Sequence, residues 1–300
     1  MIRELTYKIT SSDNNKTILS FLQEKGYSRN VIVHLKKTPE SILKNGIWCY
    51  VNERLSQGDI LSIKLIETES SLKIPAIPLP LSIVYEDEDI LVVNKPADMP
   101  IHPSLNNYEN TLANAVMWYF ENQGIPYTFR CINRLDRDTT GLTILAKNML
   151  SAGILSNAMK NRQIQKEYLA ICIGLVTEKG TIHAPIARAD GSTIERCVDY
   201  EHGEKAVTHF KPEKTKNAPT GHFSLVRLTL ETGRTHQIRV HMKHIGHPLI
   251  GDFLYNPTDT SMKRQALHCC CLKFHHPITE DFLTFEAPLP EDMKIFLDNL

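Results

Sequence analysis

Two acids and three arginines lie within nine residues near the middle of the chain. They are Arg130, Arg134, Asp136, Arg137 and Asp138. A carboxylate among guanidinium groups stays ionised at neutral pH, because nearby positive charge favours its charged form. An ionised carboxylate can act as a nucleophile or a general base, and it is a poor general acid. Taken alone, the segment is more typical of a solvated turn with surface ion pairs than of a catalytic site.

A second distinctive stretch covers residues 232–251 and contains no acid. Thr235 is a natural N-cap residue, and Gly246 is a natural residue just past a helix end. The apolar residues between them recur at helical spacing and predict a buried stripe, made of Ile238, Met242 and Ile245. The spacing therefore predicts a helix that begins after Thr235 and ends before Gly246.

The same helix has a cationic face. His236, Arg239 and Lys243 follow one another at spacings of three and four residues, so they share one side of the helix. A cationic surface without acids suits an anion such as phosphate, or a buried carboxylate that needs a partner.

The elements that must position these residues alternate irregularly between strand and helix. We expect a hairpin over 83–95, helices over 111–120 and 149–159, and strands over 141–146, 166–173, 206–212 and 222–231. Residue 110 is the expected cap of the first of these helices. Hairpin signals outnumber any repeating βα period, so the predicted class is α/β (α+β) with a mixed, mostly antiparallel central sheet.

Residues 1–70 read as a small unit of their own. Helical spacing over 16–25 ends at Gly26, Ser28 can cap a second helix, and strands are expected over 47–51 and 60–65. Residues 71–80 contain three prolines and predict a semi-rigid linker. The predicted domains are therefore 1–70 and 81–300, joined by this linker.

Composition is that of a globular protein with a balanced charge. The formal net charge is zero, so any nucleic-acid partner must be met by a local patch. Seven cysteines without a CxxC pair indicate a reduced, intracellular protein. The chain has no apolar run of membrane-spanning length and no signal-peptide core, so we expect a cytoplasmic protein that does not contact a membrane.

Abundant histidines and cysteines raise the alternative of a metal-dependent hydrolase. Their spacing argues against it, because His241 and His244 have no accompanying glutamate and three adjacent cysteines would point in alternating directions on a strand. We expect no metal site.

Five sets of motifs between residues 80 and 295 resemble the RluA-type pseudouridine synthases. They are Arg134-Leu135-Asp136 with Thr139-Thr140-Gly141-Leu142 and Ala146-Lys147, Glu88 to Pro96 with His102-Pro103, Lys166-Glu167-Tyr168, Gly233 to His241 with Gly246 to Asp252, and Leu267-His268 with His276-Pro277. The order of elements in residues 1–70 resembles an S4-like RNA-binding module. One departure is Asn133, since the family commonly has histidine before Arg-Leu-Asp.

The resemblance implies an isomerase that detaches uracil from ribose and rejoins it through carbon, with no cofactor. It implies that Asp136 is the catalytic carboxylate and Arg239 its ion-pair partner. Tyr168, which on a strand would ordinarily be a core residue, matches a tyrosine that stacks on the flipped uracil and is a candidate for taking the proton from its C5.

The resemblance also implies an RNA partner, with ribosomal RNA favoured over transfer RNA, and we expect a monomer. Arg134 would fill the space left by the flipped base or bind the RNA backbone. The remaining candidates for RNA contact are Lys95, Arg234 and Lys243, together with Arg29, Lys36 and Lys37 in the S4-like unit. The alternative function is a non-catalytic RNA-binding or assembly factor on the same scaffold.

Overall fold

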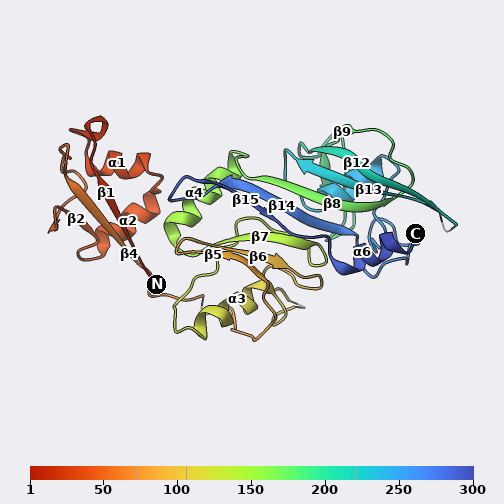
Figure 1. Cartoon of the computed structure of the whole chain (residues 1–300), viewed down its shortest axis with the longest axis horizontal. Helices are drawn as coiled ribbons and strands as arrows, with labels where there is room; N and C mark the ends of the chain where they lie inside the picture. Colours follow the sequence, from red (N-terminus) through yellow and green to blue (C-terminus); the bar gives the residue numbers. More distant parts are fainter. Residues whose placement is uncertain (72, 106, 220) are drawn as a thin grey trace.

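The computed structural model describes residues 1–300 apart from 72, 106 and 220. A large sheet of nine strands forms its centre (Figure 1), in the order β5-β6-β7-β14-β8-β13-β12-β9, with β15 paired to β14. The strands are β5 (Ile83–Glu86), β6 (Ile90–Lys95), β7 (Thr140–Ala146), β8 (Gln165–Ile173), β9 (Gly180–His183), β12 (Val207–Ala218), β13 (Gly221–Leu230), β14 (Leu267–His275) and β15 (Phe282–Glu286). Strands β10 (Ile186–Arg188) and β11 (Arg196–Val198) form a separate two-stranded sheet.

All neighbours in the large sheet are antiparallel except β14 and β7, which pair in parallel. The predicted mixed, mostly antiparallel sheet is therefore confirmed. Cys269 of β14 lies opposite Gly141 of β7 on one side and opposite Tyr168 of β8 on the other. Strand β14 thus joins the two halves of the sheet at the level of the first motif.

Both faces of the sheet are covered around β6 and β7. Leu91 and Val93 of β6 pack toward α3 (Leu112–Glu121), which lies below β5 and β6 in Figure 1. Ile90 and Val92 face the opposite way, into the core that includes Leu155 of α4 (Met149–Lys160). Strand β6 is apolar on both sides for this reason. Helix α3 is capped by Thr111 rather than by the expected residue 110.

A four-stranded sheet with the order β1-β4-β2-β3 forms the N-terminal part. It consists of β1 (Ile2–Lys8), β2 (Ile42–Lys44), β3 (Ile47–Trp48) and β4 (Ile60–Ile66), with α1 (Ile18–Glu24) and α2 (Arg29–Lys37). Ser28 caps α2, as expected. Strand β1 was not predicted, and the strand expected over 47–51 is only two residues long.

The N-terminal part contacts the large part through buried charges and through apolar residues that include Leu150, Met149, Ile154 and Ile278. Arg3 of β1 pairs with Asp89 at 2.8 Å, Arg130 pairs with Glu67, and Leu150 of α4 joins the N-terminal core. The segment 73–80 packs its apolar side chains on α3, while residue 72 of the predicted linker lies outside the described residues. Helix α6 (Glu291–Asp298) lies at the opposite end of the molecule (Figure 1). In the part of the chain that the structure describes, no helix is long and apolar enough to cross a bilayer.

Candidate active site

Asp136 lies in the loop that leads into β7. Leu135 before it is buried, and the Thr139 N–H donates to the Asp136 carbonyl at 3.1 Å, which closes a turn around the carboxylate. The Asp136 side chain keeps 29% of its surface exposed. The turn therefore presents one acid to solvent. Asp138, the other acid, is largely buried and accepts two hydrogen bonds from Arg137, at 3.0 and 2.9 Å. Asp138 therefore serves as a hydrogen-bond partner within the turn.

Asn133 holds this loop against β7. Its amide nitrogen donates to the Leu142 carbonyl at 3.0 Å, and its amide oxygen accepts from the Ile144 N–H at 2.8 Å. The side chain thereby pairs with β7 much as another strand would, and it is 3% exposed. Asparagine, which stands where the family commonly has histidine, thus contacts β7 through its side chain. This contact fixes the start of the loop that presents Asp136.

Arg239 reaches Asp136 from α5 (Gln237–His244). Its Nη1 lies 3.3 Å from Asp136 Oδ2, while Nε and Nη2 donate to the two oxygens of Asp252, both at 2.7 Å. Burial by itself would lower the pKa of Arg239, but the two carboxylates raise it above its usual value. Asp252 therefore orients a permanently charged guanidinium, and its remaining nitrogen faces Asp136.

His236 is the N-cap of α5, in place of the predicted Thr235. It adopts a left-handed conformation with φ 58°, which places its ring between Tyr255 and Asp136. The Tyr255 hydroxyl accepts the Arg196 N–H at 2.9 Å, so its proton is free to donate to His236 Nδ1 at 2.8 Å. Burial lowers the pKa of His236, against the opposing charge of Asp136. The other ring nitrogen, Nε2, lies 3.8 Å from the Asp136 carboxylate.

Tyr168 lies on β8 and is buried. Burial, followed by the neighbouring Cys269 and Asp136, raises the pKa of Tyr168 well above its usual value. The phenol therefore stays protonated at neutral pH, so in the resting protein it offers an apolar face and a hydrogen-bond donor rather than a base.

A hollow of about 1150 Å³ connects these side chains. The predicted residues that line it are Arg134, Asp136, Tyr168, Arg234 and Arg239. An ionised carboxylate, a fixed guanidinium and an aromatic ring at one opening are the parts that nucleophilic or general-base chemistry on a flat heterocycle needs.

A sequence model described as RNA pseudouridylate synthase matches residues 89–244, about half of the chain. The RNA pseudouridine synthase YjbO of Bacillus subtilis (strain 168) is 40% identical over 279 residues, which cover 93% of this chain and 97% of that protein. The chain belongs to the RNA pseudouridylate synthase family. The predicted resemblance to RluA-type synthases is thereby confirmed, and the protein is an isomerase that acts on RNA.

Two further proteins place the synthase among its relatives. The ribosomal large subunit pseudouridine synthase D of Haemophilus influenzae is 38% identical over 263 residues, covering 83% of this chain and 79% of that protein. The solved structure of human RNA pseudouridylate synthase domain containing 1 aligns with a TM-score of 0.60 at 29% identity. It covers 71% of this chain and 85% of that one.

Lys95 does not fit the predicted contact with phosphate. It ends the buried strand β6, is 1% exposed, and donates to the carbonyls of Pro96 at 2.7 Å and Arg137 at 2.9 Å. Burial, opposed by the nearby aspartates, lowers the pKa of Lys95 to about 7. In the synthase Lys95 links the end of β6 to the Asp136 loop, because Arg137, whose carbonyl accepts from Lys95, belongs to that loop.

The other predicted RNA contacts are exposed. Arg234 lies at the rim of the hollow and pairs with Glu204, whereas Lys243 lies outside it, with its ammonium 5.7 Å from the centre of the Tyr255 ring. Arg134 is exposed beside His102, whose pKa is lowered by burial and by the Arg134 charge. The three N-terminal candidates, Arg29, Lys36 and Lys37, are exposed on α2 and do not line the hollow.

Asp252 and His236 are parts of the site that sequence reasoning did not assign. A signal for Asp252 was present, because a buried arginine in an acid-free stretch needs a carboxylate and Asp252 is the first acid after that stretch. His236 gave no comparable signal, since its role depends on Tyr255, which follows it by nineteen residues.

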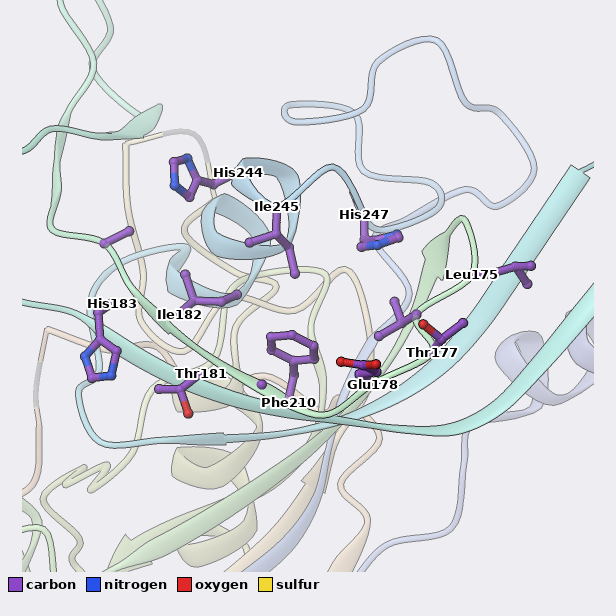
Figure 2. A pocket seen from close by; sticks show the side chains of 13 residues that line it. Leu175, Thr177, Glu178, Thr181, Ile182, His183, Phe210, His244, Ile245 and His247 are labelled. Atoms are coloured by element: carbon purple, nitrogen blue, oxygen red, sulfur yellow. The ribbon is translucent and has the colours of Figure 1, made fainter.

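A second, smaller hollow of about 500 Å³ lies beyond the C-terminal end of α5 (Figure 2). Phe210 and Ile182 form an apolar centre, and Glu178, His183 and His244 lie around it. Among the residues that line this hollow there is no arginine or lysine to pair with its acid. It lacks the ion pair of the first hollow, so the hollow around Asp136 is the candidate active site.

Several histidines considered as metal ligands are hydrogen-bonded within the core. His241 contacts Thr208 Oγ1 and the Ala184 carbonyl, both at 2.8 Å, and His268 contacts Thr140 Oγ1 at 2.8 Å. The ring nitrogens of both residues already have partners within the protein.

Proposed function

We propose that the synthase modifies a uridine in ribosomal RNA and that Asp136 is its catalytic carboxylate. Relatives named ribosomal large subunit pseudouridine synthase D, from Haemophilus influenzae and Salmonella typhimurium, are 38% and 36% identical to this chain and support the substrate class. The observation that carries the role of Asp136 is its position at 3.3 Å from Arg239 in the hollow that Tyr168 lines.

In the proposed reaction the bond between ribose C1′ and uracil N1 breaks while the base stays in the hollow. The base rotates, a bond forms between C1′ and C5, and the C5 proton is lost while N1 gains one. The carboxylate of Asp136 assists by attacking either the ribose or the base. Arg239 holds this carboxylate in position through the contact at 3.3 Å. The proposal needs no cofactor, since the number of electrons in the base and sugar does not change.

The uridine must leave its stack to reach Asp136, at an unstacking cost of a few kcal/mol. In our proposal the uracil lies against the ring of Tyr168, and Arg134 at the mouth of the hollow takes the vacated space or binds the backbone. Arg234 and Lys243 contact phosphates outside the pocket, which would favour binding without reading sequence.

The N-terminal unit is proposed as an S4-like RNA-binding domain over residues 1–70, with a linker at 71–80 and the catalytic domain at 81–300. Exposed Arg29, Lys36 and Lys37 on α2 support a phosphate-binding role for it. We propose further that the enzyme acts as a monomer in the cytoplasm. All seven cysteines are free, which supports a reducing compartment.

Release of tritium from 5-³H-uridine-labelled RNA tests the proposal. Purified enzyme should release tritium from Bacillus subtilis ribosomal RNA faster than from transfer RNA, and Asp136→Asn should abolish release. Equal release by Asp136→Asn would remove Asp136 from the chemistry. Faster release from transfer RNA would overturn the substrate class.

Replacing Arg29, Lys36 and Lys37 together by glutamine should weaken RNA binding without lowering kcat at saturating RNA.

A further inference from the structure

Helix α4 ends in a way that ordinarily requires glycine. The Arg162 N–H donates to the Met159 carbonyl at 3.1 Å and the Gln163 N–H donates to the Ala158 carbonyl at 2.8 Å. These two bonds define a Schellman end, in which the residue after the cap is left-handed and is usually glycine. Here that residue is Arg162, with φ 60°. The chain thus has a long cationic side chain at a position where the backbone conformation favours glycine.

The contacts of Arg162 within the protein are weak. Its guanidinium lies at the rim of the active-site hollow with 57% of the side chain exposed. The only acid paired with it among the described residues is Glu231, at 3.8 Å, and the other oxygen of Glu231 contacts His209 at 2.9 Å. An exposed pair at that distance contributes little to folding.

Lys166 lines the same hollow from β8. It lies two residues before Tyr168, so both side chains leave the strand on the same face. Apart from positions 72, 106 and 220, the chain has no carboxylate within 4.0 Å of its ammonium, whose nearest polar contact is Met159 Sδ at 3.8 Å. Burial lowers the pKa of Lys166, as expected for a cation that lacks a counter-charge.

Glu167, the acid between Lys166 and Tyr168, does not neutralise the charge of Lys166. Glu167 leaves the strand on the opposite face, where it pairs with Lys273 at 2.7 Å and Arg227 at 2.9 Å. Glu167 and Glu231 also line the hollow, but both contact other side chains, so among the described residues the Lys166 ammonium has no carboxylate partner beside the ring on which the base is proposed to stack. A half-buried ammonium without a partner is unfavourable unless a ligand supplies the missing charge.

We infer that Arg162 and Lys166 form a clamp for the RNA backbone phosphate next to the flipped uridine. The inference rests on the RNA substrate proposed above. When the base lies on Tyr168, the phosphates of the same nucleotide come within reach of a lysine two residues away on the same face. Arg162 at the rim supplies a planar, bidentate donor to such a phosphate. The clamp acts on substrate position, so it affects binding rather than the reacting atoms.

Binding of Bacillus subtilis ribosomal RNA to three variants tests the clamp. Arg162→Gly introduces the residue that the helix end favours, so the variant should be at least as stable as the unmodified enzyme. Its Kd for RNA should rise about tenfold. Lys166→Met should raise the Kd by a similar factor, and Lys166→Arg should restore most of the affinity. For each lost contact, the slope of log Kd against log salt should fall by about 0.7 to 0.9. The kcat at saturating RNA should stay within about twofold.

Glu280→Gly is the matched control, because Glu280 is also left-handed, with φ 63°, and does not line the hollow. It should bind RNA as the unmodified enzyme does. Unchanged Kd and salt slope in both Arg162→Gly and Lys166→Met would overturn the clamp. So would a loss of kcat at unchanged Kd in Lys166→Met, which would place the lysine at the reacting atoms. The binding assay does not depend on turnover, so a failure to modify ribosomal RNA would be seen separately in the tritium assay.

Discussion

Replacing Asp252 by asparagine should unfold the enzyme more readily and also slow its chemistry. Asp252 is completely buried, and its two oxygens hold an arginine that is only 3% exposed. Removing one partner of a buried ion pair costs about 3–5 kcal/mol, because the other charge is left in a poorly solvating environment. Arg239 would keep a single carboxylate contact, with Asp136 at 3.3 Å.

The molecule provides a matched control in a second bidentate pair. Arg264 is 7% exposed and donates to Asp292 at 2.7 and 2.8 Å, but 46% of the Asp292 side chain is in contact with solvent. Arg264 also donates to three backbone carbonyls, so it stays hydrogen-bonded without its acid. Asp292→Asn should therefore cost only about 0.2–1 kcal/mol.

Urea unfolding of the three proteins measures these costs, and tritium release measures kcat. Without its anchor, the Arg239 guanidinium can shift, and a displacement of about 1 Å at a catalytic group can cost about a hundredfold in rate. We expect Asp252→Asn to lose both stability and kcat, and Asp292→Asn to lose little of either. If Asp252→Asn unfolds at the same urea concentration as Asp292→Asn, the buried pair with Asp252 does not hold Arg239 in place.

Three further changes test other contacts. Asn133→Ala leaves the Leu142 carbonyl and the Ile144 N–H without their side-chain partner. The variant should lose about 2–4 kcal/mol of unfolding free energy in urea and should have a lower kcat. Unchanged stability would show that Asn133 does not hold the loop against β7. Gly141→Ala should cost about 3 kcal/mol or more, because a Cβ there would lie 2.2 Å from the Cys269 carbonyl oxygen at φ 115°; a soluble variant with native stability would contradict the register of β14. Burial lowers the pKa of His268 to about 4, below its value near 6.5 in the unfolded chain. The unfolded state therefore binds the extra proton first as the pH falls. The free energy of unfolding should fall by about 3 kcal/mol between pH 6.5 and pH 4. The same pH series with His268→Asn should lack that part of the loss, and an identical pH dependence would refute it.

Local patterns were sufficient for the elements that carry most of the site. The hairpin over 83–95, helix α4, strand β8 and the pair β12–β13 follow from periodicity and turn residues, and the structure confirms them. Strand β14 was not predicted, because a strand buried on both faces does not alternate.

Long-range contacts explain the residues that were predicted wrongly. Thr235 is the better N-cap by its intrinsic preference, yet the ring of His236 is held by Tyr255 and shifts the helix start by one residue. Lys95 resembles a surface lysine until its partner, the carbonyl of Arg137, is known from the fold. In both cases a contact distant in sequence overrides a local preference.

The place of β14 between β7 and β8 has a consequence for how the protein is made. During translation β7 and β8 leave the ribosome long before β14, and N-terminal segments fold first. Until β14 is inserted, both strands present unpaired edges that can join other chains. Gly141, the second residue of β7, and Tyr168 of β8 both pair with Cys269. A nascent chain that stops before residue 267 therefore has the sequence of the candidate active site without the strand that aligns its two halves, and this arrangement can form only after β14 has been synthesised.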